Sequence, residues 1–486
     1  MKYSVKYPLL VLFVLMILSA SARSAPLLSL DAFLQEVRTG NQGFKGAALS
    51  SQAGMERSTE GNLILAPTFF TNYNYINDSK APLIPLYNYD TQNLNNLSVG
   101  VSQLTDFGLQ AKIHYDFFET NYVNLQVPSF GLPAGATPTI TNPIIQTTPT
   151  LELSQSFWGN GFGAGTRATR DLLEAAALSS SFNSSYQAKT ALADAETTYW
   201  RLANDRQEIL MEEQALDRAQ KIYEWATRRE RLHLGDRSDT LQAQAALKLR
   251  ALDMQSTLDE TRQASLAFNS SRNLDSDLVP EILPSVSAAE VLKLSAPLRI
   301  GVRDDVKAAE QNQKAVLANS FLSQEKNSGT FNVLGSIALN GRAGDVSTSL
   351  SNPFSAGKPT AAIGFQFSVP IDPLVYKGIQ EGWAKERRAA EMTYERKLFE
   401  QETTWSDLTS RLKESRRRLD LAHTIESIQG DKLTHEKRRL TQGRTTAYQV
   451  LVFEQDFITS QIARVRSQND VLTTLAQMKL FGDQSL

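Results

Sequence analysis

The 486-residue chain contains no cysteine. This absence excludes disulfide bonds, thiolate zinc sites and cysteine nucleophiles. Histidine is scarce as well, and its four copies show no metal-binding spacing such as HExxH. They are His114, His233, His423 and His435. We therefore expect no metal, no cofactor and no enzymatic activity, because no convergent set of polar residues suggests a catalytic centre.

The chain also lacks an excess of charge of one sign. Lys and Arg number 50 against 52 Asp and Glu, which gives a formal net charge of -2. A nucleic-acid-binding protein usually presents a basic face, so no nucleic-acid partner is expected. The glycine-rich stretch GNGFGAG (159–165) superficially resembles a dinucleotide loop, but the strand before it is amphipathic and no strand-end acid follows about 20 residues later. We expect these glycines to let a strand bend into a helix.

Long apolar runs are missing too. The longest one, Leu9–Leu18, follows Lys2 and Lys6 and precedes the small-x-small sequence Ala20-Ser21-Ala22. This pattern is typical of a secretory signal peptide, which we place at 1–22, and about ten apolar residues are too short to cross a bilayer. No later segment is apolar over about 18 residues, so we expect an exported protein without a transmembrane helix.

What the chain does have is a set of two-faced strands. In LQAKIHYDFF (109–118), apolar residues alternate strictly with Gln110, Lys112, His114 and Asp116. Such a period of two predicts a strand with one apolar and one polar face. Similar alternation predicts strands at about 66–77, 95–104, 149–157, 330–340 and 360–369. The stretch TDFG (105–108) predicts a tight turn, whereas 78–93, 119–148 and 340–359 read as long polar loops.

The rest of the sequence has a helical period. We predict a helix at 28–61 with a weak point at Gly40–Gly46, and another at about 286–325. Two long helical hairpins are predicted at about 165–273 and 376–481, broken by Gly235 and Gly443. Apolar residues recur every seven positions along them, a coiled-coil-like pattern. The heptad residues are Ala195, Leu202, Ile209, Leu216 and Tyr223, then Leu398, Trp405, Leu412 and Leu419, and finally Leu451, Ile458, Val465 and Leu472.

The same order of elements occurs twice, which indicates an internal two-fold repeat. We place the first repeat at 23–283 and the second at 284–486. Each comprises a helix, strands, a long helix, a turn and a second helix. The predicted fold class is therefore α+β.

The strands predict a membrane-spanning barrel. A soluble sandwich also alternates, but strands of 9–11 residues have the length that crosses a bilayer, and very unequal loops are typical of outer-membrane barrels. Backbone groups in lipid must be paired, so the strands must form a closed transmembrane β-barrel. Six strands are fewer than the usual minimum of eight, so several chains must contribute. Lys112, His114 and Asp116 would then face the lumen, and Tyr115 and Phe117 the lipid.

Several motifs, in the same order in both halves, resemble the TolC-like outer-membrane efflux proteins over essentially the whole mature chain. LSLDAFLQEVRTGN and RDDVKAAEQNQKAVLANSFL resemble the first helix of each repeat. QFSVPIDP, with Pro370, resembles the strand-to-helix return, and SQSFWGNGFG its counterpart with Ser156 in place of that Pro. RLHLGDRSDTLQAQAAL and RLTQGRTTAYQVLVFEQ resemble the two hairpin tips.

The resemblance implies a homotrimer. Its strands would form one shared barrel in the outer membrane, continuous with a long periplasmic α-helical barrel. A periplasmic adaptor protein and an inner-membrane pump would feed this duct, and outer-membrane lipid would surround the strands. The chain would be the passive exit duct of a tripartite efflux or type I secretion system, and the substrate stays open. The alternative is a structural periplasmic coiled-coil protein without a channel.

Two departures from the family pattern matter. The simplest members contribute four strands per chain, and here 95–118 adds a hairpin that either enters the barrel, giving about 18 strands in a trimer, or folds over its mouth. Some members also carry acidic residues six and nine positions after the second tip glycine, where this chain has Gln449 and Val452, so that gate is not transferred.

Charged residues at the two tips are candidates for a different gate or for adaptor contact. They are Asp236, Arg237 and Asp239 at the first tip and Arg438, Arg439 and Arg444 at the second. They would form ion pairs between the hairpins that hold the end shut, or else remain solvated.

Overall fold

The computed structural model describes residues 26–80, 88–126, 141–355 and 357–482. The predicted signal peptide at 1–22 lies outside these residues. The chain forms two compact units: one comprises the residues up to Gln52, Ser181–Lys307 and those from Arg396 on, and the other comprises Ala53–Ser180 and Ala308–Glu395.

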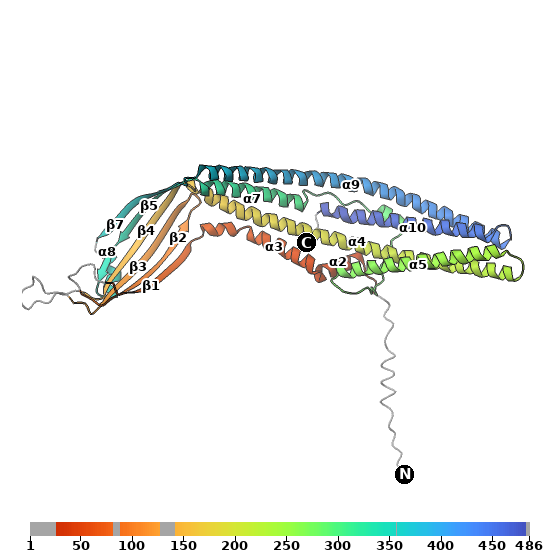
Figure 1. Ribbon diagram of the computed structural model, residues 1–486, viewed down its shortest axis with the longest axis horizontal. Helices are drawn as coiled ribbons and strands as arrows, with labels where there is room; N and C mark the ends of the chain where they lie inside the picture. Colours follow the sequence, from red (N-terminus) through yellow and green to blue (C-terminus); the bar gives the residue numbers. More distant parts are fainter. Residues whose placement is uncertain (1–25, 81–87, 127–140, 356, 483–486) are drawn as a thin grey trace, which may run out of the picture. The chain divides into compact units, whose positions relative to one another are not determined.

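The second unit contains a seven-stranded antiparallel sheet (Figure 1). Its main strands pair in the order β1-β2-β3-β4-β5-β7, and a short strand, β6, pairs with β4. The bounds are β1 Thr68–Asp78, β2 Thr91–Leu104, β3 Leu109–Val123, β4 Ile144–Trp158, β5 Thr330–Leu339, β6 Gly341–Ala343 and β7 Pro359–Ser368. In the described part of the chain, the outer edges of β1 and β7 have no partner strand.

The hairpin formed by β2 and β3 is part of this sheet. β2 pairs with β1 from Gln92 to Ser102, and β3 pairs with β4 from Leu109 to Thr120. The hairpin therefore does not fold away over one end of the sheet. Both strands are longer than predicted, because Asn- and Gln-rich ends such as Gln92-Asn93 still pair in the ladder although they lack apolar alternation.

The tight turn at 105–108 packs against the glycines that end β4. Gly108 adopts a φ of 81° and Gly163 one of 76°, a region that favours glycine. A Cβ at Gly163 would lie only 2.1 Å from the Asp106 carbonyl oxygen. As predicted, the glycines of 159–165 serve the passage from strand to helix, and here they also admit the neighbouring turn.

The segment 340–359 is not simply a polar loop, so that prediction is wrong. It holds β6, paired with Ile145–Thr147 of β4, and the helix α8, Val346–Ser355. Alternation could not reveal either, because β6 has three residues and the helix is rich in Ser and Thr.

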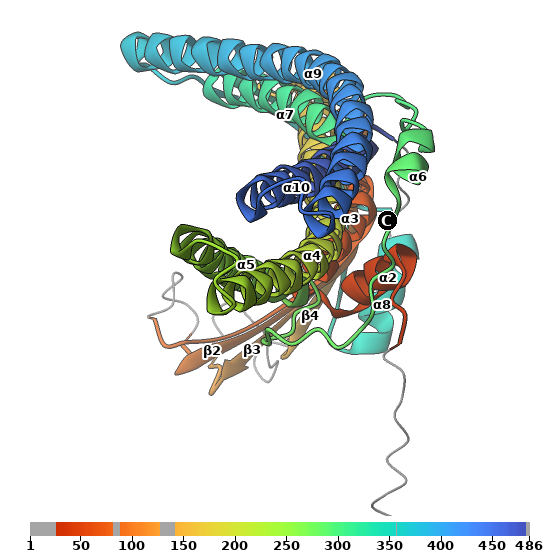
Figure 2. The same ribbon diagram turned by 90° about the vertical axis from the view of Figure 1, so that its right-hand side faces the viewer.

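Long helices form the first unit and extend into the second (Figure 1). Their bounds are α2 Leu30–Gly40, α3 Gln42–Arg57, α4 Ala164–Arg231, α5 Arg237–Ser271, α6 Ala288–Lys293, α7 Asp304–Asn327, α9 Pro373–Thr441 and α10 Ala447–Met478. At 1.5 Å per residue, α4 and α9 are each about 100 Å long. Figure 2 shows α5 beside α4 and α10 beside α9. None of the helices in the described ranges is apolar enough over its length to cross a membrane.

The predicted helix at 286–325 is in fact two helices, α6 and α7, joined by an extended segment. Pro297 and Gly301, the latter with a φ of 71°, lie in this segment and explain the break. The first predicted helix divides at Asn41 into α2 and α3, within its expected weak point.

Two hydrophobic cores of the first unit each lie at one helical hairpin, and a third joins both hairpins near the tips through residues such as Ile222 and Leu433. Phe33 of α2 stacks on Phe268 of α5, and the buried Tyr199 of α4 donates a hydrogen bond of 2.8 Å to the Leu28 carbonyl. The second core joins α6, α9 and α10 through residues such as Val291 and Leu419. Heptad residues Leu202, Leu412, Ile458, Val465 and Leu472 are buried in this unit.

Candidate functional site

Lys112, His114 and Asp116 lie on one face of the sheet, as their spacing predicts. His114 Nδ1 is 3.0 Å from Asp116 Oδ2, and its Nε2 is 3.3 Å from Glu152 Oε1 on β4. Lys112 Nζ lies 3.4 Å from the other oxygen of Glu152. The four side chains form a charged cluster that spans β3 and β4. Glu152 is a member that sequence reasoning left out of the candidate site.

An aromatic ring covers part of this cluster. Phe70 of β1 lies with its ring centroid 5.1 Å from Lys112 Nζ and 6.4 Å from the ring of His114. Gly100 of β2 makes room for it, because a Cβ there would lie 2.7 Å from the Phe70 ring and 2.6 Å from His114 Cβ. The resulting packing leaves His114 only 8% exposed.

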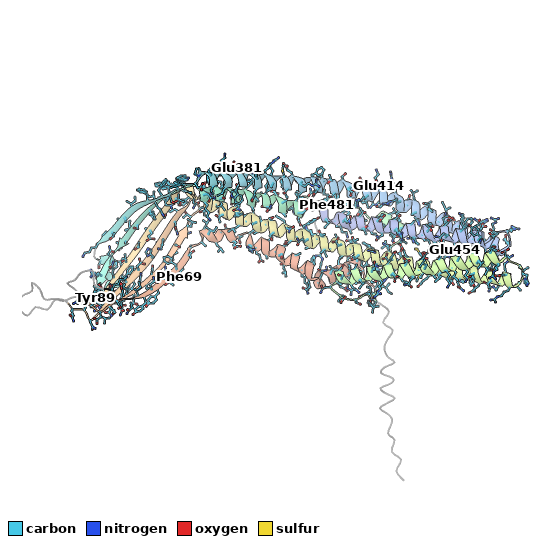
Figure 3. All side chains as sticks on the ribbon, viewed as in Figure 1. Phe69, Tyr89, Glu381, Glu414, Glu454 and Phe481 are labelled. Carbon is cyan, nitrogen blue, oxygen red and sulfur yellow. The ribbon has the colours of Figure 1, made fainter. Side chains whose placement is uncertain are left out.

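The opposite face of the sheet is apolar and exposed. The cross-strand partners Phe69, Val101, Ile113, Leu151 and Ile337 lie side by side on it, and Phe69 is labelled in Figure 3. Ile113 is 64% exposed although it lies on a central strand. Exposed apolar patches of this extent mark a surface that another partner or a lipid phase covers.

The two hairpin tips have the same turn. Leu234 donates its backbone NH to the Arg229 carbonyl, and Arg444 does so to that of Arg439, both at 2.9 Å. In return, the Arg229 side chain donates a hydrogen bond to the Leu234 carbonyl, and the Arg439 side chain donates one to the Arg444 carbonyl. His233, with a φ of 54°, occupies the left-handed position that Gly443 takes in the second tip. Equivalent residues of the two turns are 210 positions apart in the sequence, and this correspondence supports an internal duplication.

The predicted tip residues make contacts within their own tip. Asp236 caps α5, accepting a hydrogen bond of 2.7 Å from the Ser238 NH. Arg237 lies 3.8 Å from Glu230, and Arg439 lies 3.1 Å from Glu436. Among the described residues, no ion pair involves the side chains of the other three predicted residues. These are Asp239, Arg438 and Arg444.

Ion pairs between the two hairpins lie deeper, at residues that the sequence did not single out. Glu454 of α10, labelled in Figure 3, lies 2.6 Å from Arg218 of α4 in the other hairpin, and 2.5 Å from Lys437 of α9 in its own hairpin. Further from the tips, Glu208 of α4 lies 3.7 Å from Arg466 of α10. No local sequence signal points to these pairs, because they depend on which faces of the helices meet.

The acidic residues on the buried side of α4 have perturbed acidity. Burial raises the pKa of Glu208 to about 7, although Arg466 opposes the shift. Burial likewise raises the pKa of Asp205 to about 6, against the opposing charge of Arg201. These two carboxyl groups therefore titrate in the neutral to mildly acidic range.

Over the residues that the structure describes, neither the charged cluster on the sheet nor the two hairpin tips have a metal-binding arrangement. Within the described ranges, no group of three or more His, Asp or Glu side chains is placed to hold a metal ion. A sheet with one charged and one apolar face can line a passage on one side and contact a partner or an apolar phase on the other.

The chain resembles several solved outer-membrane channels. It matches the outer membrane protein VceC from Vibrio cholerae with a TM-score of 0.63 and 14% identity, over 93% of this chain and 96% of that one. The outer-membrane channel OprN matches with a TM-score of 0.63 and 13% identity, over 93% and 89%. CusC matches with a TM-score of 0.63 and 11% identity, over 95% and 94%. No family model and no curated protein sequence matches the chain. The predicted TolC-like fold, long helices combined with an antiparallel sheet, is confirmed.

Proposed function

We propose that this chain is one of three identical subunits of an outer-membrane channel. The channel would be the passive exit duct of a tripartite efflux or type I secretion system. One observation carries the proposal: the sheet exposes an apolar face and leaves the edges of β1 and β7 unpaired in the described chain. In lipid such edges cost several kcal/mol per unpaired group, so copies of the chain must close them.

The topology supports closure into a ring. The six main strands all pair antiparallel, so β1 and β7 run in opposite directions. When β7 of one copy meets β1 of the next, the new pair is antiparallel as well. Three copies then form a barrel of about 18 strands, within the range of outer-membrane barrels.

The two faces of the sheet then have different surroundings. The apolar face with Phe69 and Ile113 contacts lipid, and the face with Lys112, His114 and Asp116 lines a wet lumen. Charged side chains are tolerated on a lumen-facing wall, whereas on the lipid side they are destabilising. The sheet is a wall for passive conduction, and this chain is not an enzyme.

The helices supply the periplasmic part of the duct. The tip turns lie at the ends of α4 and α9 that are remote in sequence from the strands. Helices of about 100 Å extend far beyond a hydrocarbon core of about 30 Å, so we place a periplasmic adaptor protein and an inner-membrane pump at these tips. The exposed Arg237, Arg438 and Arg444 are candidates for adaptor contact or for a gate.

The proposal is tested by fractionation and electrophysiology. The full chain is expressed with its leader, extracted from outer membranes with detergent, weighed by native mass spectrometry and inserted into planar bilayers. We expect a trimer with discrete conductance steps. A detergent-independent soluble monomer without conductance would instead support the structural coiled-coil alternative, which leaves the exposed apolar face unexplained.

The partners are tested separately in cells. Chemical crosslinking followed by affinity purification of the chain should recover an adaptor and a pump. Tip variants with Arg438 and Arg444 changed to Gln should recover less of the adaptor, while a variant at the exposed Arg411, midway along α9, should not. Equal recovery by all three would remove the tips from the contact.

A further inference from the structure

The helix α8 (Val346–Ser355) lies on the apolar face of the sheet. The Thr147 hydroxyl donates a hydrogen bond to the Ser349 carbonyl, and the Ser349 hydroxyl donates one of 3.2 Å to the Ile145 carbonyl. Tyr115 on β3 donates its hydroxyl to the Leu350 carbonyl at 3.2 Å. Tyr115 and Thr147 belong to the same face as Ile113 and Leu151, since all stand at even separations along their paired strands.

Unlike a typical surface helix in water, this helix exposes its large apolar side chains. Its buried residues on the sheet side are Ser349 and Pro353, and Pro353 lies against Gly341 of β6. Val346, Leu350 and Phe354 recur every four residues and are exposed by 48%, 44% and 71%. In water, the apolar stripe of a surface helix faces the core of the protein. Here it faces outward beside the contact with the sheet.

The rest of the helix surface is polar but carries no charge. The exposed hydroxyl residues Ser347, Thr348, Ser351 and Ser355 occupy the side opposite the buried Ser349 and Pro353, next to the apolar stripe. Asp345 caps the helix, accepting a hydrogen bond of 2.9 Å from the Thr348 NH. An apolar stripe and a hydroxyl-rich stripe on one short helix suit a boundary between hydrocarbon and water.

The position of α8 indicates what covers its apolar stripe. It contacts β3, β4 and β6, which lie in the middle of the sheet, and the unpaired edges belong to β1 and β7. A neighbouring copy that joins at those edges therefore does not reach it by strand pairing. The helix contacts the start of β4, at Ile145 and Thr147, whereas α4 follows the end of that strand.

We propose that α8 is an interfacial helix whose Val346, Leu350 and Phe354 insert into the acyl chains of the outer leaflet beside the barrel. The proposal rests on the proposed function, because it needs the sheet to span the outer membrane. The hydroxyl stripe then faces the headgroups. The helix would mark the level at which the barrel leaves the hydrocarbon.

The absence of cysteine allows a direct test. Single variants Phe354→Cys, Ser351→Cys and Ile337→Cys are labelled with an environment-sensitive fluorophore and reconstituted into phosphatidylcholine vesicles with or without brominated acyl chains. Iodide serves as the aqueous quencher. Trimer mass and conductance are measured for each labelled variant, so that only assembled protein is compared.

The proposal predicts that brominated lipid quenches the label at 354 as it does at 337, and that iodide quenches the label at 351. If the label at 337 responds to brominated lipid while the one at 354 responds only to iodide, or to neither quencher, the role of α8 is overturned and the proposed function stands. If the label at 337 does not respond to brominated lipid, the proposed function itself fails, and this inference fails with it.

Discussion

Single buried carboxyl groups on α4 set a pH response of the helical hairpins. The raised pKa of Glu208, about 7, means that the folded state holds its proton more tightly than the unfolded state. Its contribution to the free energy of unfolding is therefore fully present below the ordinary glutamate pKa, about 4.3. This contribution is lost as the pH rises through about 7.

We predict that Glu208→Gln makes thermal stability less dependent on pH between these two values. The amide needs no proton to stay neutral, so the variant should gain stability relative to the unsubstituted chain at the upper end of the range. Melting temperatures measured across the range check this. Glu213→Gln, at an exposed position on the same helix, is the matched control and should leave the slope unchanged. If the melting temperature changed with pH equally in the unsubstituted chain and in both variants, Glu208 would not be the source of the pH dependence.

The ion pairs of Glu454 link α4, α9 and α10. Glu454→Gln leaves the partly buried Arg218 without its carboxylate, at a side-chain exposure of 19%. We expect a loss of about 1–3 kcal/mol, between the values for exposed and buried pairs. Denaturation measurements on Asp217→Asn, which removes an exposed pair with Lys221, should show nearly no change. Similar losses of unfolding free energy in both variants would mean that the ion pairs of Glu454 stabilise the chain no more than an exposed ion pair does.

The tip arginines are tested by conductance. If Arg237 and Arg444 take part in holding the periplasmic end shut in the trimer, replacing either with Gln should raise single-channel conductance in planar bilayers. Arg411→Gln, at an exposed pair on α9, should have no effect. An unchanged conductance in both tip variants would leave these residues as solvated charges.

At the scale of residues, the sequence predicts which face of a strand a side chain occupies, but not which other side chains it contacts. Lys112, His114 and Asp116 could be assigned to one face because a strand repeats every two residues. The contacts of Lys112 and His114 with Glu152 depend on the register of β3 against β4, which alternation does not encode. The ion pairs between the hairpins, such as those of Glu454 and Glu208, could not be predicted, because facing positions on long helices depend on their supercoil and not on local motifs.

At the scale of elements, the two tip turns offer a matched comparison. His233 and Gly443 occupy the same left-handed position, where a side chain costs roughly 1–2 kcal/mol. His233→Gly should therefore raise the melting temperature, and Gly443→Ala should lower it. Differential scanning calorimetry on both variants checks the signs. If both changes moved the melting temperature in the same direction, the turns would not be equivalent.

Elements with a sustained period were predictable, and those without one were not. The six main strands and the long helices follow repeats of two and seven residues. The prediction missed α8 because its apolar stripe has only three residues among serines. It also joined α6 to α7, although Pro297 and Gly301 were visible breakers. Strand ends extended beyond the alternation because ladder hydrogen bonds use the backbone, whatever the side chain.

For the whole molecule, the proposed function depends on a contact between β7 of one copy and β1 of the next. We predict that cysteine pairs, with one residue on each edge strand, crosslink copies into dimers and trimers on denaturing gels. A small panel that combines Tyr73→Cys with successive positions of β7 will include the correct register. Cysteines on the central strand β4 should give no intermolecular product. A panel without crosslinked trimers would contradict closure at these edges.

The even number of main strands has a consequence for how such a pore can change size. A ring closes with every neighbour antiparallel only if each copy contributes an even number, so strands can be gained or lost only in hairpins. Removing the β2–β3 hairpin would bring β1 against β4, which also run in opposite directions. Each such step changes the circumference by six strand widths, at about 4.8 Å apiece. The width of such a pore can therefore change only in steps, and the smallest step is one hairpin in each copy.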